Sequence, residues 1–189
     1  MKKVGVFGGT FDPIHHGHLV LAREARETFD LDVVKFIPAS ASPHKMTQIS
    51  APPEARLEML RSALNSEPGF ECDMMELERP APSYTVETIE RLSVEDETAQ
   101  FFYLIGDDNL SQLPTWHRFE ELSQMVQFVV LNRTGSNLQH SYPMIRRRLD
   151  ISATEIRARV AAGRSIRYLV PLAVEEIIRK RQLYRGTPS

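Results

Sequence analysis

Two apolar runs near the start of the chain, with a helical pattern between them, constrain the fold more than any other feature. Residues 3–7 and 33–37 are short runs rich in β-branched and aromatic side chains, which is typical of buried strands. Residues 19–29 place apolar and small side chains at helical spacing. A strand, a helix and a second strand in this order form a βαβ unit with parallel strands. The chain is therefore expected to build a parallel sheet.

The same alternation of strands and helices continues along the chain. Further strands are expected at residues 70–72, 100–105 and 126–131, and further helices at residues 54–64, 86–92, 119–125, 152–162 and 172–181. This order predicts an α/β protein with a Rossmann-like, doubly wound, mostly parallel sheet, helices on both faces and a helical C-terminal segment. No repeat or linker divides the 189 residues, so residues 1–189 are expected to form a single domain.

Composition and charge exclude several classes of protein. No apolar stretch approaches the roughly 18 residues of a membrane helix, so no membrane partner is expected. Cys72 is the single cysteine, which excludes an internal disulfide and disfavours a zinc site built on cysteine. The first strand begins at once after the amino terminus and leaves no room for a signal peptide. These features predict a cytoplasmic protein.

Positive charge gathers toward the C-terminus. Residues 140–189 carry 11 Lys and Arg against 4 Asp and Glu, although the net charge of the chain is only −2. Such a field can draw in a polyphosphate, but most of these arginines are better explained as solvated helix faces. Nucleic acid is not expected as a partner, because the pI is about 6.3 and no basic patch is interleaved with aromatic residues.

The turn after the first strand predicts a binding site for phosphate. Gly8 and Gly9 end the apolar run, and glycine lets backbone N–H groups approach an anion without a Cβ in the way. The helix that follows contributes unpaired N–H groups and a partial positive charge. His15 and His18 lie at this corner, where they can donate to phosphate oxygens. A nucleotide phosphate is the natural ligand of such a corner, whereas the missing G-x-G-x-x-G fingerprint disfavours an NAD-dependent oxidoreductase.

Two loops add candidate residues, each with a simpler alternative. Lys45, after His44 in a proline-rich loop, can reach phosphate as a mobile charge, or it is an ordinary exposed cation. Arg56 is a lesser candidate of the same kind. Trp116, the single tryptophan, belongs to the core or stacks on a ligand ring from its loop after Pro114.

Two predicted helix starts are further candidates. The segment Ser83-Tyr84-Thr85 either caps a helix or presents its first N–H groups to an anion. Ser152 and the glutamate three residues later form a capping box, and the same turn offers Thr154 and Arg157 to a polyphosphate.

Adjacent carboxylates follow the predicted strand at residues 100–105. Gly106 allows close approach of a ligand, and Asp107 and Asp108 stand at the carboxyl end of the strand, where ligands of open α/β sheets bind. The alternative is an ordinary turn with an Asp cap. Two neighbouring carboxylates facing one site would repel each other, so one of them is expected to point away.

The segment GGTFDPIHHGH at residues 8–18 resembles the signature of the nucleotidylyltransferase superfamily with the His-x-Gly-His motif. Among its members, the chain is most similar to the bacterial nicotinate-nucleotide adenylyltransferases, and the later segments match them as well. Two positions depart from the pattern. Asp107 stands where alanine is usual, so Asp108 is the better match to the aspartate of these enzymes, and Ala153 replaces a serine.

The resemblance implies a set of site residues. The residues implied to bind ATP are Gly8, Gly9, Thr10, Phe11, His15, His18, Gly106, Asp108, Ser152, Thr154 and Arg157. Those implied to bind the second substrate are His44, Lys45, Ser83, Tyr84, Thr85, Asp107 and Trp116. The residues implied to be catalytic are His15, His18, Lys45 and Arg157.

The resemblance also implies a reaction, in which ATP and nicotinate mononucleotide give deamido-NAD and pyrophosphate for NAD biosynthesis. The mononucleotide phosphate attacks the α-phosphorus in line without a protein base, and Mg²⁺ is held by the substrate phosphates and not by a protein metal site. The acid is preferred over the amide because a helix start suits a carboxylate. The alternatives are nicotinamide-mononucleotide or pantetheine-phosphate adenylyltransfer, or a nucleotide sensor without turnover. A homodimer stays open, because the sequence does not fix the number of subunits.

Overall fold

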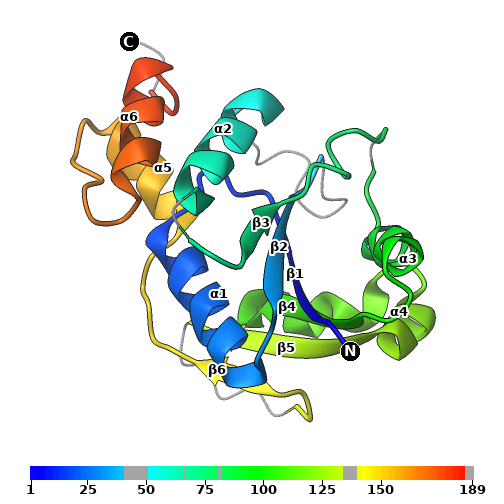
Figure 1. Ribbon diagram of the computed structural model, residues 1–189. Coiled ribbons are helices and arrows are strands. Elements are labelled where there is room, and N and C mark those ends of the chain that lie inside the picture. Colours follow the sequence, from blue (N-terminus) through cyan, green and yellow to red (C-terminus); the bar gives the residue numbers. More distant parts are fainter. Residues whose placement is uncertain (41–50, 66, 81, 134–139, 186–189) are drawn as a thin grey trace.

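The computed structural model describes residues 1–40, 51–65, 67–80, 82–133 and 140–185. Its strands are β1 (Lys3–Gly9), β2 (Val33–Pro38), β3 (Phe70–Cys72), β4 (Gln100–Gly106), β5 (Val126–Asn132) and β6 (Met144–Arg146). They form one six-stranded sheet in the order β3-β2-β1-β4-β5-β6, and all neighbouring pairs are parallel (Figure 1). This order confirms the expected doubly wound, Rossmann-like α/β fold.

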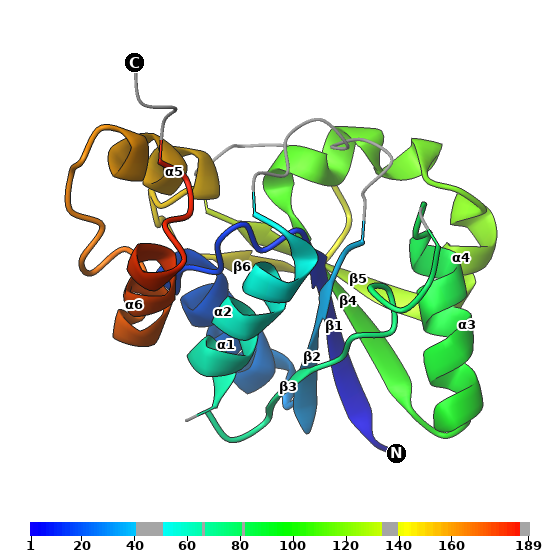
Figure 2. The same cartoon turned by 90° about the horizontal axis from the view of Figure 1, so that it is seen from above.

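Helices cover both faces of the sheet. The helices are α1 (His16–Phe29), α2 (Pro53–Leu64), α3 (Thr85–Glu95), the 3₁₀ helix η1 (Asp107–Thr115), α4 (Phe119–Met125), α5 (Ala153–Ala161) and α6 (Leu172–Lys180). Helices α1, α2, α5 and α6 gather on one side of the strands, and α3 and α4 on the other (Figures 1 and 2). The apolar side chains accordingly form two cores, one on each face of the sheet.

Each core is formed in part by the apolar side chains that recur at helical spacing in the sequence. On one face, Leu21 and Ala25 of α1 pack with Leu60 of α2 against the sheet. On the other face, Ile89 of α3 and Leu122 of α4 are fully buried. Removing such apolar side chains from water stabilises the fold by about 1.5 to 3 kcal/mol each. In the parts of the chain that the structure describes, no helix is both long and apolar enough to span a membrane.

Three local features differ from the expectations. Helix α1 begins at His16, three residues before the predicted start, so that it includes His18 in its first turn. The 3₁₀ helix η1 replaces an expected turn. Strand β6 was not predicted, because its three residues are too few to show a period.

The topology fixes where a ligand can bind. Strand β1 lies between β2 and β4, and the chain leaves β1 toward one face of the sheet and β4 toward the other. A crevice therefore opens beyond the carboxyl ends of these two strands, at the switch point of the strand order. Gly8, Gly9 and Gly106 all lie at this edge.

Candidate active site

A cavity of about 710 Å³ lies at the carboxyl edge of β1 and β4. The last residues of both strands line it, together with the starts of α1, α3 and α5 and the end of η1. Cavities of roughly 300 to 1,000 Å³ are typical of sites for small ligands and cofactors. Three helix N-termini around one cavity give it a positive potential that suits phosphates and carboxylates.

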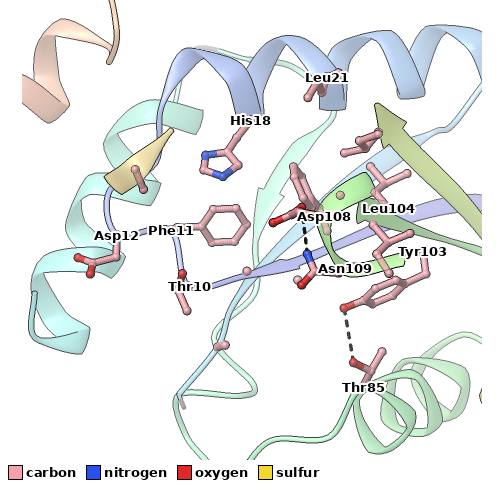
Figure 3. A pocket seen from close by; sticks show the side chains of 18 of the residues that line it. Thr10, Phe11, Asp12, His18, Leu21, Thr85, Tyr103, Leu104, Asp108 and Asn109 are labelled. Carbon is pink, nitrogen blue, oxygen red and sulfur yellow. Dashed lines mark hydrogen bonds between the residues drawn. The ribbon is translucent and has the colours of Figure 1, made fainter. Parts of the chain in front are cut away.

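The two histidines of the first motif stack face to face in the wall of the cavity. Their ring centroids are 3.7 Å apart and the planes differ by 22°. The backbone N–H of His15 donates to Nδ1 of His18 at 3.3 Å, so a neutral His18 carries its proton on Nε2. A Cβ on Gly17 would lie 3.0 Å from the His15 ring, which explains why this position is glycine. Figure 3 shows the His18 ring beside Phe11, with the ring centroids 5.2 Å apart.

His15 is only 2% exposed, although it lines the cavity. Burial, and secondarily the positive charge of Arg133, lower the pKa of His15 from 6.5 to about 3. The imidazole of His15 is therefore neutral at physiological pH. It can donate one hydrogen bond to a ligand but does not bring a positive charge.

The low pKa of His15 predicts a loss of stability in acid. Between pH 6.5 and 3 the unfolded chain binds a proton at His15, whereas the folded chain does not. The contribution of His15 to the free energy of unfolding is therefore fully present above pH 6.5 and decreases as the pH falls below that value. The slope from this one group is at most about 1.4 kcal/mol per pH unit.

NMR of the ring nitrogens should show a neutral His15 from pH 8 down to pH 5. Urea unfolding at pH 7.5 and 5.0 should show a smaller change in His15→Gln than in the wild type. A ring that titrates near pH 6.5 would contradict the buried geometry.

Arg157 of α5 reaches across to the loop after β1. Its Nη1 donates to the backbone oxygen of Asp12 at 2.8 Å, and its Nη2 donates to Oγ1 of Thr154 at 3.4 Å. Ser152 accepts from the N–H of Glu155 at 3.1 Å and so caps α5, as the capping box predicts. Ser152, Thr154 and Arg157 all line the cavity, which brings residues about 145 positions apart to the same site.

Arg56 does not act as a phosphate contact in this arrangement. Its side chain is fully buried, and Nη1 donates to the backbone oxygens of Thr10 and Ala39 at 2.8 and 2.9 Å. Arg56 is absent from the residues that line the cavity. The expectation for Arg56 is therefore wrong: the guanidinium holds the loop after β1 from behind. The other basic candidates of this region, His44 and Lys45, lie outside the described residues.

The start of α3 forms the far wall of the cavity. Ser83, Tyr84 and Thr85 line it, and Oγ1 of Thr85 lies 3.5 Å from the hydroxyl of Tyr103 on β4 (Figure 3). Burial raises the pKa of Tyr103, so its phenol stays protonated. A Cβ on Gly8 would lie 2.6 Å from the Tyr103 hydroxyl, so the glycine leaves room for this buried ring.

Trp116 lines the cavity from the end of η1, as the stacking interpretation requires. It is half-buried, and its ring meets the edge of Tyr103 with centroids 5.7 Å apart. The neighbouring His117 also lines the cavity and lies 4.4 Å from the ring of Tyr84. His117 was missed by the sequence analysis, although its place beside Trp116 was a usable signal.

The two adjacent aspartates separate at the start of η1. Asp108 is exposed and lines the cavity, where its Oδ1 accepts from the side chain of Asn109 at 3.2 Å. Asp107 is 4% exposed and does not line the cavity. One carboxylate thus points away, as electrostatic repulsion predicts. The structure does not bring Asp107 to the cavity wall, and its assignment to the substrate stays a prediction.

Arg133 is a cation of the cavity that the sequence analysis did not single out. Its Nη2 lies 3.5 Å from Oδ2 of Asp108, and its Nη1 donates to the backbone oxygen of Ile151 at 3.5 Å. It follows directly on β5, so the rule that sites lie at the carboxyl ends of strands could have found it. The remaining predicted residues, Gly9, Thr10, Phe11 and Gly106, line the cavity as well.

The amino-acid sequence matches a known family of proteins. A family model described as cytidylyltransferase-like matches residues 6–159. A protein of Bacillus pumilus, named a probable nicotinate-nucleotide adenylyltransferase, is 41% identical over 189 residues, which cover 98% of this chain and 100% of that protein. The nicotinate-nucleotide adenylyltransferase of Bacillus subtilis is 36% identical over 189 residues, with coverage of 98% and 100%.

A solved structure supports the fold. The nicotinic acid mononucleotide adenylyltransferase of Plasmodium falciparum, solved in complex with NaAD, superposes with a TM-score of 0.81 over 97% of this chain and 98% of that chain, at 17% identity. On the family match and the full-length relatives together, the chain belongs to the cytidylyltransferase-like family and, within it, to the nicotinate-nucleotide adenylyltransferases.

Proposed function

We propose that the chain transfers the adenylyl group of ATP to nicotinate mononucleotide, with deamido-NAD and pyrophosphate as products. The observation that carries this proposal is that three helix N-termini open into one cavity. Each of these termini is a site for an anion, and the reaction brings together a triphosphate, a monophosphate and a carboxylate.

The triphosphate of ATP is assigned to the side of the cavity formed by α1 and α5. There the histidine pair, the backbone after Gly9 and the N-terminal turn of α5 offer hydrogen-bond donors. Arg157 and Arg133 supply positive charge. Arginine suits this role because its planar guanidinium can donate two parallel hydrogen bonds to phosphate. Lys45, which the resemblance implies to be catalytic, is proposed to add a further positive charge to the triphosphate.

The pyridine ring of the mononucleotide is assigned to the side formed by α3 and η1. Trp116 offers an aromatic face, and such stacking is worth about 0.5 to 1.5 kcal/mol beyond the burial of area. The first N–H groups of α3, near Thr85, are proposed to receive the ring carboxylate. A helix N-terminus favours a negative group, which is the physical reason to prefer the acid over the amide.

The chemistry needs positioning and charge stabilisation but no protein base. The 5′-phosphate of the mononucleotide is already an anion at neutral pH, so its oxygen attacks the α-phosphorus of ATP directly as pyrophosphate leaves. Two nucleotides held in line within one cavity make this step effectively intramolecular. The Nε2–H of His18 is proposed to donate to the oxygens on which negative charge grows in the transition state.

Nucleotidyltransferases of this kind use a divalent metal ion, and we propose Mg²⁺ for this chain. In the described ranges, no three His, Cys, Asp or Glu side chains come together as a metal site. The cavity wall includes hydrogen-bond donors and the cations Arg133 and Arg157, which fit the phosphates that would carry the ion. When bound, Mg²⁺ would neutralise part of the phosphate charge and would keep most of its water ligands.

One assay tests this function. Purified protein is mixed with ATP, Mg²⁺ and either nicotinate mononucleotide, nicotinamide mononucleotide or phosphopantetheine, and pyrophosphate release is followed. We expect turnover with the acid, much slower turnover with the amide and none with phosphopantetheine, and mass spectrometry should identify deamido-NAD. Measurable ATP binding without turnover of any acceptor would overturn the proposal in favour of a sensor.

A further inference from the structure

We propose that Tyr184, in the segment after α6, is a positioning residue for ATP: its phenol holds Asp12 and thereby keeps Arg157 available to the triphosphate. The proposal deepens the proposed function and rests on it, because it concerns the ATP side of the same cavity. Neither Tyr184 nor Asp12 is among the site residues that the resemblance implies.

The contact joins residues 172 positions apart in the chain. The hydroxyl of Tyr184 donates to Oδ1 of Asp12 at 2.7 Å, and the backbone N–H of Ala51 donates to the same oxygen at 3.2 Å. Asp12 is 2% exposed and lines the cavity. Burial and the charge of Asp12 raise the pKa of Tyr184, so the phenol keeps its proton and remains a donor.

Asp12 also sets the position of Arg157. The backbone oxygen of Asp12 accepts from Nη1 of Arg157 at 2.8 Å, while Oδ2 of the carboxylate is 4.0 Å from the same nitrogen. The main chain of Asp12 therefore binds the guanidinium, whereas the carboxylate is only at the limit of an ion pair. The hydroxyl of Tyr184 and the N–H of Ala51 both donate to Oδ1. The buried carboxylate is therefore hydrogen-bonded without a donor from Arg157.

Loss of the Tyr184 hydroxyl would remove one of the hydrogen bonds that the Asp12 carboxylate accepts. A buried carboxylate needs hydrogen bonds, and leaving it short of one costs free energy. Arg157 is within reach, because its Nη1 lies 4.0 Å from Oδ2 of Asp12, and it would turn toward that oxygen and away from the phosphates. The neighbouring part of the loop would stay in place, because Arg56 holds the backbone oxygen of Thr10 independently. The predicted defect is therefore in ATP binding and not in the fold.

The test compares Tyr184→Phe with Tyr168→Phe. Both changes delete one phenolic oxygen, but Tyr168 is 81% exposed and does not line the cavity, so it is the matched control. The readouts are the KM for ATP and for nicotinate mononucleotide, kcat, the melting temperature, and the Kd for the α,β-methylene analogue of ATP by calorimetry. We expect Tyr184→Phe to raise the KM for ATP and the analogue Kd by about 5- to 20-fold, less than the full loss of a charged hydrogen-bond donor, because Arg157 is displaced and not removed. The KM for the mononucleotide and kcat should stay within twofold, and Tyr168→Phe should match the wild type throughout.

Each other outcome overturns the proposal. A lower melting temperature for Tyr184→Phe with an unchanged KM for ATP would mean that the contact is only structural. Equal rises of both KM values, or a loss of kcat alone, would also contradict a role in ATP positioning. If Tyr184→Phe does not fold, Asp12→Asn weakens the same contact at equal volume, and an unchanged analogue Kd in that variant would overturn the proposal. The calorimetric arm needs no turnover, so a wild type that binds the analogue but transfers no adenylyl group would refute the proposed function, and the analogue Kd of Tyr184→Phe would still decide this proposal.

Discussion

Replacement of His18 by alanine is expected to lower kcat by about 100- to 1,000-fold while the KM for ATP changes by less than about threefold, as for the loss of one preorganised donor in a transition-state site. The reason lies in the fixed tautomer. Nδ1 of His18 accepts the backbone N–H of His15, so the proton sits on Nε2 and the donor needs no reorganisation during the reaction. Charge develops on the reacting phosphate only in the transition state, so the loss falls on the chemical step.

His16→Ala is the matched control for this prediction. His16 is adjacent in sequence and half-buried at the start of the same helix, but it does not line the cavity. Its kcat should stay within about threefold of the wild type, since a substitution outside the site leaves the transition state unchanged. Rapid-quench single-turnover experiments separate chemistry from product release. Near-normal single-turnover rates in His18→Ala would contradict the role given to this imidazole.

Replacement of Arg157 by alanine is expected to lower kcat/KM for ATP by about 30- to 100-fold, the range for a hydrogen-bonded charged group. The guanidinium is held by the backbone of Asp12 and by Thr154, so it reaches the cavity in one orientation. Arg157→Lys keeps the charge but not the planar pair of donors, and it should recover only part of the loss. Steady-state kinetics at fixed, saturating mononucleotide measure the effect.

Arg159→Ala controls for the loss of one positive charge from the same helix. Arg159 donates to the backbone oxygen of Ser165 at 2.8 Å and lies 3.8 Å from Glu155, away from the residues that line the cavity. It should lower the melting temperature slightly and leave the KM for ATP unchanged. If Arg157→Ala and Arg159→Ala weakened ATP binding equally, the effect would come from the general positive field of the C-terminal arginines and not from a specific contact of Arg157 with ATP.

The parts of the site that depend on local sequence could be predicted. Gly8 and Gly9 end a strand pattern, His15 and His18 stand at the corner just before a helix pattern, and Ser152 caps the helix that carries Arg157. Each of these features is decided within a few residues. Strands followed by helices then bring such turns to one edge of the sheet, so the fold class and much of the cavity wall follow from the chain.

The remaining features depend on contacts between distant residues. Arg56 lies in an amphipathic pattern that gives no sign of complete burial, because its partners are backbone oxygens of Thr10 and Ala39. The choice between Asp107 and Asp108 depends on the direction of η1, a 3₁₀ helix with Pro114 inside it that was not predicted. Tyr184 meets Asp12 across nearly the whole chain. No local sequence pattern indicates contacts between residues that lie so far apart in the chain.

The central claim is that the mononucleotide phosphate displaces pyrophosphate from ATP directly, in one in-line step. The stereochemistry at the α-phosphorus tests it most directly. A single diastereomer of ATP with sulfur in place of one α-oxygen is converted with nicotinate mononucleotide, and the configuration of the thio-substituted product is determined. One displacement predicts inversion. Retention would require two displacements through an adenylylated protein group, and it would contradict the account.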